Sequence, residues 1–404
     1  MRGPSSRLGL MLVAVAAVVV AIAATAAART TAAKPIVIGW AADGNGAMAP
    51  FDQPALAAAK LRVNLLNSRG GVGGRKLQII TCDTQGNKPS IAKACALKLI
   101  GQGANIIFTT CDVDFAAPVV QEAINRGILA VAPCIGTDQM GPKRFGAKGA
   151  LAFSFGNVAQ DEGSAMAQYA WGRGWRTAAL ATDNVIVYFK DIVQAFKARW
   201  LQLGGKVVDE ETYQSAGGSP ASWQNTVTRL NAVKADVIVT STAPPFGAQV
   251  PIMNGLRTLG NNTPILNSWA GDGNYWYPKS PAVSNYYYVT FASAFGDDPV
   301  PAVNALRNKY QAAIAAGGNT GAFVTGWSAI DGIALALKRT NGNANGAALA
   351  AQMEKFKNVP TLSGLVTFSK NLHTVSGRTY RVIGVTNNTP KVVGTIKAKV
   401  VPKI

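Results

Sequence analysis

Few residues of this chain have the types and spacing that catalysis or metal binding usually needs. The sequence has one histidine, His373, and four cysteines, Cys82, Cys95, Cys111 and Cys134, and it contains no CxxC, HExxH or paired-histidine motif. Those are the spacings with which proteins usually hold zinc. With one histidine near the C-terminus and no GxSxG motif, a Ser/His/Asp triad is also disfavoured. The sequence therefore predicts no metal site and argues against zinc hydrolases.

A glycine-rich motif gives the second test for chemistry. Gly44, Gly46 and Ala49 form GxGxxA between a predicted strand and a predicted helix, which formally matches a dinucleotide fingerprint. The acid expected about 20 residues later is absent, since Asp83 lies 39 residues after Gly44. No GxxxxGK[ST] motif occurs either. We therefore predict no nucleotide or other cofactor.

The N-terminus predicts export. Arg2 and Arg7 precede an apolar stretch from Leu8 to Ala24, and small residues follow up to Ala28. This order is typical of a secretory signal peptide, predicted over residues 1–28, and the stretch is marginal for a membrane span; a retained anchor is the alternative. No cysteine lies near the cleavage region, so no lipid anchor is predicted. A periplasmic or extracellular location follows.

Export changes the expected state of the cysteines, because an even number of cysteines outside the cytoplasm usually forms disulfides. Four cysteines allow three pairings, and four buried thiols are the alternative.

The chain is strongly basic, with 39 Lys and Arg against 20 Asp and Glu and a net charge of +19. Its basic residues are dispersed and form no run of four or more with interleaved aromatic residues, so nucleic acid is not a predicted partner. We expect a solvated basic surface that could contact an anionic membrane or cell-wall polymer.

Apolar runs and helical periodicity alternate along the first part of the chain. The predicted strands are 35–40, 76–82, 105–109 and 127–132, and the predicted helices are 52–67, 89–101 and 116–126. Strict alternation with short connections predicts an α/β fold, in which a parallel sheet has helices on both faces.

A second series repeats this alternation. Its predicted strands are 176–182, 206–213, 235–241 and 264–267, and its predicted helices are 190–203, 222–233 and 247–259. A third stretch contains a strand at 286–291, helices near 300–316 and 323–340, and a strand-rich tail over 365–396. The tail reads as a terminal β-hairpin turning at NNTP. Two α/β lobes and a returning segment are therefore predicted.

Three segments carry a resemblance to a known family. IVIGWAADG, NLLNSRGGVGGRKLQIITCDTQGNKPSIAKACALKLI and GILAVAP resemble the N-terminal lobe of the leucine/isoleucine/valine-binding proteins of ABC importers. The resemblance extends more weakly over residues 34–404. It implies a type I periplasmic-binding-protein fold, with two Rossmann-like lobes joined by three crossovers. The lobes would comprise 34–152 with 287–362, and 153–286 with 363–404.

The family implies a function without catalysis. Its members capture a small molecule between the lobes and deliver it to an ABC permease, so we expect a monomeric binding protein and no enzyme. A sensory receptor lobe is one alternative. The chain ends at Ile404 without a predicted membrane span, which argues against this alternative. An exported enzyme is the other, since Asp112 and Asp114 could do acid–base chemistry, although acids at strand ends more often bind ligands or cap helices.

Ligands of wound sheets lie beyond the carboxyl ends of the strands. The predicted ligand loops are therefore 41–51, 110–115, 133–137, 183–189, 242–246 and 269–276. Matching the family pattern to these loops implies a ligand site that contains Phe51, Asp112, Cys134, Gly136, Thr137, Tyr188, Phe246, Trp269, Asp272 and Trp276.

Two positions depart from the family pattern. Asp112 stands where the family has a hydroxyl residue that holds the ligand carboxylate, and Cys134 to Thr137 replaces a small-small-Thr sequence. A carboxylate at residue 112 would repel a ligand carboxylate. Asp272, in contrast, matches the acid that pairs with the ligand ammonium. The departures predict a ligand with more amine than acid character, or an amide.

In this fold the third and fourth strands are neighbours, so the resemblance also favours one cysteine pairing. It favours Cys111 with Cys134, and therefore Cys82 with Cys95, although the family also has a bridge between the regions of Cys82 and Cys111.

Overall fold

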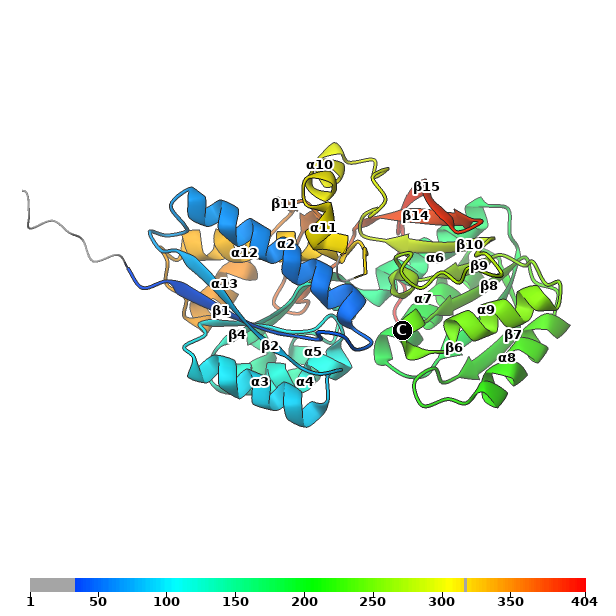
Figure 1. Cartoon of the computed structure of the whole chain (residues 1–404), viewed down its shortest axis with the longest axis horizontal. Coiled ribbons are helices and arrows are strands. Elements are labelled where there is room, and N and C mark those ends of the chain that lie inside the picture. Colours follow the sequence, from blue (N-terminus) through cyan, green and yellow to red (C-terminus); the bar gives the residue numbers. More distant parts are fainter. Residues whose placement is uncertain (1–32, 316–317) are drawn as a thin grey trace, which may run out of the picture. The chain divides into compact units, whose positions relative to one another are not determined.

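A computed structural model describes residues 33–315 and 318–404 (Figure 1). The predicted signal peptide, residues 1–28, lies outside the described residues. The first large sheet has the strand order β13-β5-β4-β3-β1-β2, with all neighbours parallel. Its strands are β1 (Ile36–Ala42), β2 (Leu77–Asp83), β3 (Ile106–Phe108), β4 (Leu129–Ala132), β5 (Ala152–Asn157) and β13 (Thr374–Val375).

Helices cover both faces of this sheet, and together they form the first lobe. They are α2 (Ala49–Ser68), α3 (Pro89–Gly101), α4 (Val113–Asn125), α12 (Ala322–Arg339) and α13 (Gly346–Met353). The short helix α5 (Pro142–Phe145) and the 3-10 turn η1 (Gly146–Leu151) follow β4, and α10 (Pro301–Lys309) and α11 (Gln311–Ala315) follow β10 (Tyr286–Thr290), with α11 packed on α2. Ile106 and Phe108 pack toward α2 and α12, whereas Ile107 packs toward α3 and α4. Burial on both faces explains the continuous apolar strands of the sequence.

The second sheet has the order β15-β14-β10-β9-β8-β6-β7. It contains β6 (Thr177–Asp183), β7 (Lys206–Tyr213), β8 (Val237–Ser241), β9 (Ile265–Asn267), β10 (Tyr286–Thr290), β14 (Thr379–Thr386) and β15 (Thr389–Lys397). Helices α6 (Ala159–Gly172), α7 (Val187–Gln202), α8 (Pro220–Ala232) and α9 (Gln249–Thr258), with the 3-10 turns η2 (Pro244–Phe246) and η3 (Trp269–Gly271), complete the second lobe. β14 and β15 form the predicted terminal hairpin.

Strand pairing corrects the predicted lobe boundaries. β5 pairs with β4 and β13 in the first sheet, so the chain changes lobe after Asn157 rather than at residue 153. β10 belongs to the second sheet, and β13 to the first, which moves the other boundaries to the segments after Thr290 and before Thr379. The partner of such a strand lies far away in sequence, so the local pattern does not indicate its lobe.

Helix α6 is the largest element that the sequence pattern missed. Its first turns bury Gln160, Asp161, Glu162 and Ser164, so it lacks the apolar stripe by which an amphipathic helix is found. At Gly163 an added Cβ would lie 2.4 Å from the backbone oxygen of Ile192 in α7. Close packing between these helices therefore requires glycine there.

The cysteines pair as the resemblance favoured. Cys82 at the end of β2 is bonded to Cys95 in α3, with their Cα atoms 5.5 Å apart. Cys111 after β3 is bonded to Cys134 after β4, with their Cα atoms 4.8 Å apart. Both bridges join parts of the first lobe.

Among the described helices, none has the length and apolarity needed to cross a bilayer. The described residues also contain no cluster of His, Cys, Asp or Glu that could hold a metal ion.

Candidate functional site

The candidate site is a small cavity between the carboxyl ends of the two sheets. Its free volume is about 20 Å³, room for about one water molecule. The loops that follow β1, β3, β6, β8 and β9 form its wall. The lining residues are Met48, Phe51, Cys111, Asp112, Ile186, Tyr188, Phe189, Ala243, Phe246, Trp269 and Ala270.

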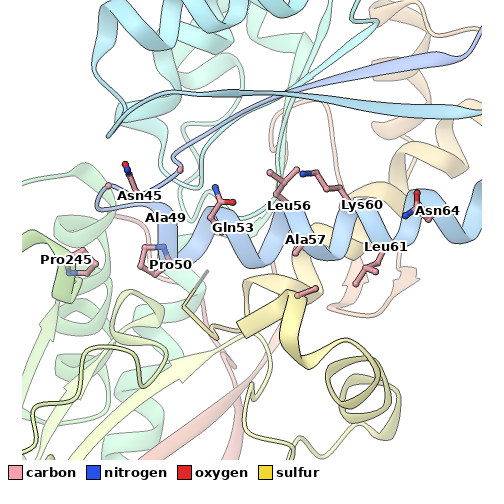
Figure 2. A pocket seen from close by; sticks show the side chains of 13 residues that line it. Asn45, Ala49, Pro50, Gln53, Leu56, Ala57, Lys60, Leu61, Asn64 and Pro245 are labelled. Atoms are coloured by element: carbon pink, nitrogen blue, oxygen red, sulfur yellow. The ribbon is translucent and has the colours of Figure 1, made fainter. Parts of the chain in front are cut away.

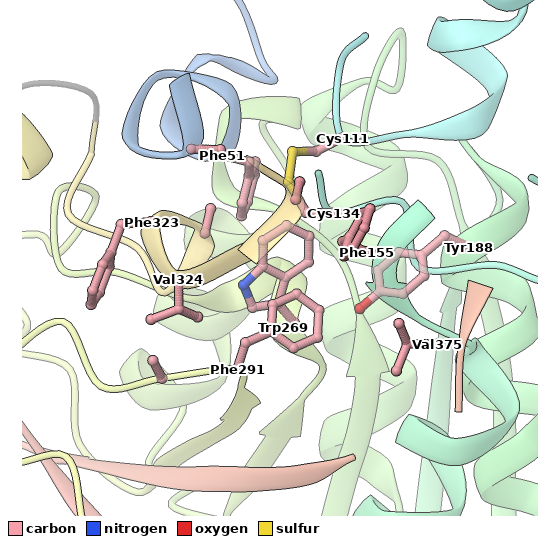
Figure 3. Packing of buried hydrophobic residues seen from close by; sticks show 14 of the residues in the cluster. Phe51, Cys111, Cys134, Phe155, Tyr188, Trp269, Phe291, Phe323, Val324 and Val375 are labelled. Atoms are coloured by element: carbon pink, nitrogen blue, oxygen red, sulfur yellow. A yellow bond between two sulfur atoms is a disulfide. The ribbon is translucent and has the colours of Figure 1, made fainter. Parts of the chain in front are cut away.

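Aromatic rings from both lobes close this cavity. Trp269 lies between Phe51, with ring centroids 4.9 Å apart, and Phe291, with centroids 4.8 Å apart (Figure 3). Phe51 belongs to the first lobe and Trp269 to the second, so their contact spans the site. Phe246 lies edge-on to Phe189, with centroids 5.7 Å apart. Aromatic rings therefore make up much of the wall of this cavity.

One buried carboxylate positions two of the lining residues. Glu162 in α6 is fully buried, and its Oε1 accepts from the Tyr188 hydroxyl at 2.9 Å and from the Trp269 backbone N–H at 2.6 Å. Burial raises the pKa of Glu162 to about 7, against the hydrogen bonds from Trp269 and Tyr188, which lower it. This carboxylate thus joins α6 to the loops after β6 and β9.

Asp112 is the acid that lines the cavity. Its Oδ1 caps α4 by accepting from the backbone N–H groups of Asp114 at 2.9 Å and Phe115 at 3.3 Å. Burial, followed by the charge of Asp114, raises the pKa of Asp112 to about 7. Asp112 therefore supplies a carboxyl group to a wall that is otherwise mainly apolar.

Asp114 makes a polar contact between the lobes beside the cavity. Its Oδ2 accepts from the backbone N–H of Val187, the first residue of α7, at 2.8 Å. Its Oδ1 accepts from Arg144 at 2.7 Å. The Asp112 and Asp114 pair that acid–base chemistry could have used thus makes a helix cap and a contact between lobes.

The structure does not bring Asp272 into the cavity wall. Its carboxylate, fully buried, accepts from the Thr290 hydroxyl and the backbone N–H groups of Gly321 and Gly273, each at 2.7 Å. Trp269 begins the turn η3 and lines the cavity, whereas Asp272 follows the turn and contacts Gly321 at the start of α12. Asp272 thus links β10 of the second lobe to the first lobe.

The remaining predicted site residues lie behind or beside the wall. Trp276 is half-buried and packs against Tyr277 and Tyr286, with ring centroids 4.6 and 5.3 Å away, at the edge of the core of the second lobe. Thr137 is buried and accepts from the Gln139 backbone N–H at 3.2 Å. The structure therefore brings together Phe51, Asp112, Tyr188, Phe246 and Trp269, and leaves Cys134, Gly136, Thr137, Asp272 and Trp276 outside the lining.

Gly136 has a supporting position behind the wall. A Cβ at this residue would lie 2.6 Å from the ring of Tyr188. Cys134 is buried and bonded to Cys111. Both residues therefore shape the wall without lining it.

Comparison with known proteins assigns the family. The family model described as periplasmic binding protein matches residues 35–389. The chain belongs to the periplasmic binding protein family. Leu/Ile/Val-binding protein BraC3 of Rhizobium johnstonii is 22% identical to this binding protein over 342 residues, which cover 83% of this chain and 88% of BraC3.

Solved structures of the same fold bind different ligands. The LivJ substrate-binding protein of Streptococcus pneumoniae, in complex with isoleucine, has a TM-score of 0.75 and 19% identity, with 90% of this chain and 99% of LivJ covered. A solute-binding protein of an ABC transporter from Rhodopseudomonas palustris, in complex with 3,4-dihydroxybenzoic acid, has a TM-score of 0.71 and 19% identity. The match covers 90% of this chain and 95% of that protein. The fold of this binding protein is therefore the one found in LivJ-type structures.

The cavity of this periplasmic binding protein is lined from the loops in which the sequence predicts ligand contacts, but by partly different side chains. Met48, Ile186, Phe189, Ala243 and Ala270 line the cavity from loops that were predicted to bind ligand, but the family pattern did not select them. Only a search for apolar residues within each loop could have found them. No local sequence pattern indicates Glu162, because it positions Tyr188 and Trp269 through contacts with two loops that are distant in sequence.

A larger cavity of about 600 Å³ lies beside α2 (Figure 2). Gln53, Lys60 and Asn64 line it, and Pro245 of the second lobe reaches it. It begins at the loops after β1 and β8 that also contribute to the aromatic cavity. The wall of this larger cavity is more polar than that of the aromatic cavity, and the larger cavity is more open to solvent. We therefore place the candidate ligand site in the aromatic cavity.

The stability of the binding protein should depend on the protonation of Glu162. Its folded-state pKa of about 7 lies above its ordinary value of 4.5, so this group stabilises the fold below pH 4.5, and that contribution is lost as pH rises through 7. The difference between these two pKa values corresponds to about 3 kcal/mol in the free energy of unfolding. We would measure the free energy of unfolding in urea by tryptophan fluorescence from pH 4.5 to 8.5. This free energy should decline less with rising pH in Glu162→Gln than in the wild type.

Glu210 provides the control for this measurement. It is an exposed acid that pairs with Lys197, so Glu210→Gln should retain the wild-type pH dependence. An unchanged slope in Glu162→Gln would contradict the assignment.

Proposed function

We propose that this chain is the extracytoplasmic substrate-binding protein of an ABC importer, and that it captures a small molecule in the aromatic cavity. The observation that carries this proposal is the closure of one cavity by Phe51 of the first lobe and Trp269 of the second, at the carboxyl ends of both sheets. Such edges are where wound sheets bind ligands. Capture without turnover is the proposed activity, and a membrane permease is the proposed recipient.

The proposed ligand has an apolar or aromatic body and a hydrogen-bond donor. Phe51, Phe246 and Trp269 would enclose the body, and the Asp112 carboxyl would accept from the donor. The related structures contain isoleucine in one case and a dihydroxybenzoic acid in another, which supports an amino acid or an aromatic compound. Because Asp112 would repel a nearby carboxylate once ionised, we favour an amine, amide or hydroxyl group at that end.

The proposed mechanism requires the lobes to open. A free volume of about 20 Å³ is too small for an amino acid, so the Phe51–Trp269 contact must separate before ligand enters. Bound ligand would then contact both lobes and shift the population toward a closed form. The connections after β5, after β10 and between β13 and β14 would bend as this happens.

Export completes the proposal. We propose that residues 1–28 are a cleaved signal peptide without a lipid anchor, so that the mature protein acts outside the cytoplasm. The cystine pairs Cys82–Cys95 and Cys111–Cys134 support this location, because such bonds persist in oxidising compartments.

A thermal-shift screen tests the proposed function. The protein would be unfolded and refolded to remove carried-over ligand, then mixed with amino acids, amides, amines, benzoates and sugars. A compound at 100 times its Kd should stabilise the fold by about 2.7 kcal/mol. Mass spectrometry should recover that compound unchanged; its conversion to product would contradict capture without turnover, and no shift across the panel would count against the aromatic cavity as a binding site.

Asp112→Asn should change the preferred ligand class. Asparagine is an equally good N-cap, so the fold should persist, while loss of the charge should strengthen binding of benzoates and weaken binding of amines by about fivefold each. Calorimetric titration of both classes measures the change. Asp331→Asn, which alters an acid paired with Arg62 away from the cavity, should leave both affinities unchanged, and the same result for Asp112→Asn would remove Asp112 from the site.

A further inference from the structure

A third cavity lies where the last connection between the lobes enters the second sheet. Its volume is about 320 Å³, and it shares no lining residue with the aromatic site. The hairpin of β11 (Val359–Thr361) and β12 (Gly364–Val366) forms one side, and the N-terminal end of β14 with the C-terminal end of β15 forms the other. Ser363 in the first hairpin donates its backbone N–H to Ser328 of α12 at 2.9 Å. The cavity therefore has walls from both lobes.

The β14–β15 side of this cavity presents hydrogen-bond donors. Thr379 lies opposite Lys397, and Arg381 lies opposite Thr395, in the antiparallel register. All four residues line the cavity, and no aspartate or glutamate does. Cross-strand neighbours lie close enough to contact one ligand. Lys397 is exposed and has no carboxylate partner among the described residues, so its ammonium is available to a ligand.

Two arginines, Arg381 and Arg378, lie beneath this surface, and they differ in how their charge is compensated. Arg381 is neutralised by Asp298, with Nε and Nη2 each 2.8 Å from a carboxylate oxygen. Arg378 is not neutralised in this way, because its Nη1 and Nη2 donate to the backbone oxygens of Ser363 and Phe155 at 2.7 and 2.9 Å. Its Nε finds no acceptor in the described part of the chain.

Within the part of the chain that the structure describes, Arg378 is a buried cation with no ion-pair partner. Only 3% of it is exposed, and burial lowers its pKa to about 10. Asp161, the acid whose charge acts on it, accepts from the Gly377 backbone N–H instead. An isolated buried charge is unfavourable unless an opposite charge lies near it. A bound anion in the cavity would supply that charge.

We propose that this cavity is a second binding site, for a small oxyanion with phosphate or carboxylate chemistry. Lys397 and the hydroxyl groups of Thr379 and Thr395 would donate to the anion oxygens, and Arg378 would contribute positive potential. Such charge-assisted hydrogen bonds are the ones that hold oxyanions. Because the walls come from both lobes, the anion would join them beside the third connection, independently of the ligand in the aromatic cavity.

Calorimetric titration with inorganic phosphate tests this site. Purified full chain would be titrated in a phosphate-free buffer at constant ionic strength, and acetate would replace phosphate in a second series. We expect saturable binding of at least one of the two anions. In Lys397→Gln the Kd for that anion should rise about three- to fivefold, the upper part of the range expected when one exposed charge pair is lost.

Lys391→Gln is the matched control. Lys391 lies on the same strand and is exposed, but it does not line the cavity, so this variant should bind the anion with wild-type affinity. Both variants should melt within about 2 °C of the wild type without anion, because they alter exposed side chains. The absence of saturable binding up to 20 mM of either anion, or an equal loss of affinity in both variants, would overturn the proposal.

Discussion

Trp269→Ala should weaken binding of the strongest compound from the thermal-shift panel by about 100-fold. The Trp269 ring contacts Phe51 across the cleft, and Trp269 lines the cavity. A buried aromatic side chain at the centre of an interface typically contributes 2 to 4 kcal/mol, which corresponds to about 30- to 1,000-fold in affinity. Isothermal titration at 15 °C gives the affinity of each variant.

Two further variants separate binding from folding. Trp276→Ala removes the same kind of side chain from the edge of the core of the second lobe, where it packs against Tyr277 and Tyr286 outside the cavity. It should lower Tm but change affinity less than threefold. Trp269→Phe, which keeps an aromatic ring, should recover most of the affinity. Equal losses in Trp269→Ala and Trp276→Ala would show that Trp269 acts through stability alone.

Asp298→Ala should produce the largest loss of stability, about 3 to 5 kcal/mol. Asp298 forms a bidentate pair with Arg381, and the two side chains are 0% and 8% exposed. Its oxygens also accept from the backbone N–H groups of Ser293 and Val300 at 2.8 Å. Removing one partner of a buried pair leaves an uncompensated charge, which accounts for the magnitude. Urea unfolding followed by tryptophan fluorescence measures the change.

An exposed pair in the same lobe provides the comparison. Glu210 and Lys197 are 51% and 40% exposed, so Glu210→Ala should cost less than about 1 kcal/mol. The double variant Asp298→Ala, Arg381→Met should recover part of the stability lost in Asp298→Ala, because it removes the unpaired cation. A cost below 1 kcal/mol for Asp298→Ala would contradict a buried ion pair.

Local patterns predicted most of the regular elements. The helix expected over 89–101 is α3 (Pro89–Gly101), and the strand expected over 206–213 is β7 (Lys206–Tyr213). The turn expected at NNTP joins β14 to β15 through Asn387 and Asn388, which both have positive φ, 49° and 60°. Asparagine accepts this conformation more readily than most residues. In each case the physical cause is contained within a short segment.

Long-range contacts account for the features that the local pattern did not indicate. The burial of Glu162 and Asp161 in α6 hides that helix from a periodicity search, because the acids are matched by donors from other segments. Asp272 was expected beside the ligand, but its carboxylate is held by Thr290 and Gly321. Which donors surround an acid depends on segments that are distant in sequence.

The sequence by itself determined the α/β class, the loops at the ends of the strands and the aromatic types that they carry. These features follow from hydrophobic periodicity and turn residues, which act over a few positions. Tertiary structure alone decided that Phe51 meets Trp269, that Trp276 packs against the edge of a core, and that Arg378 is buried with no carboxylate partner among the described residues. A side chain's function depends on which groups reach it, and the packing of the two lobes determines that.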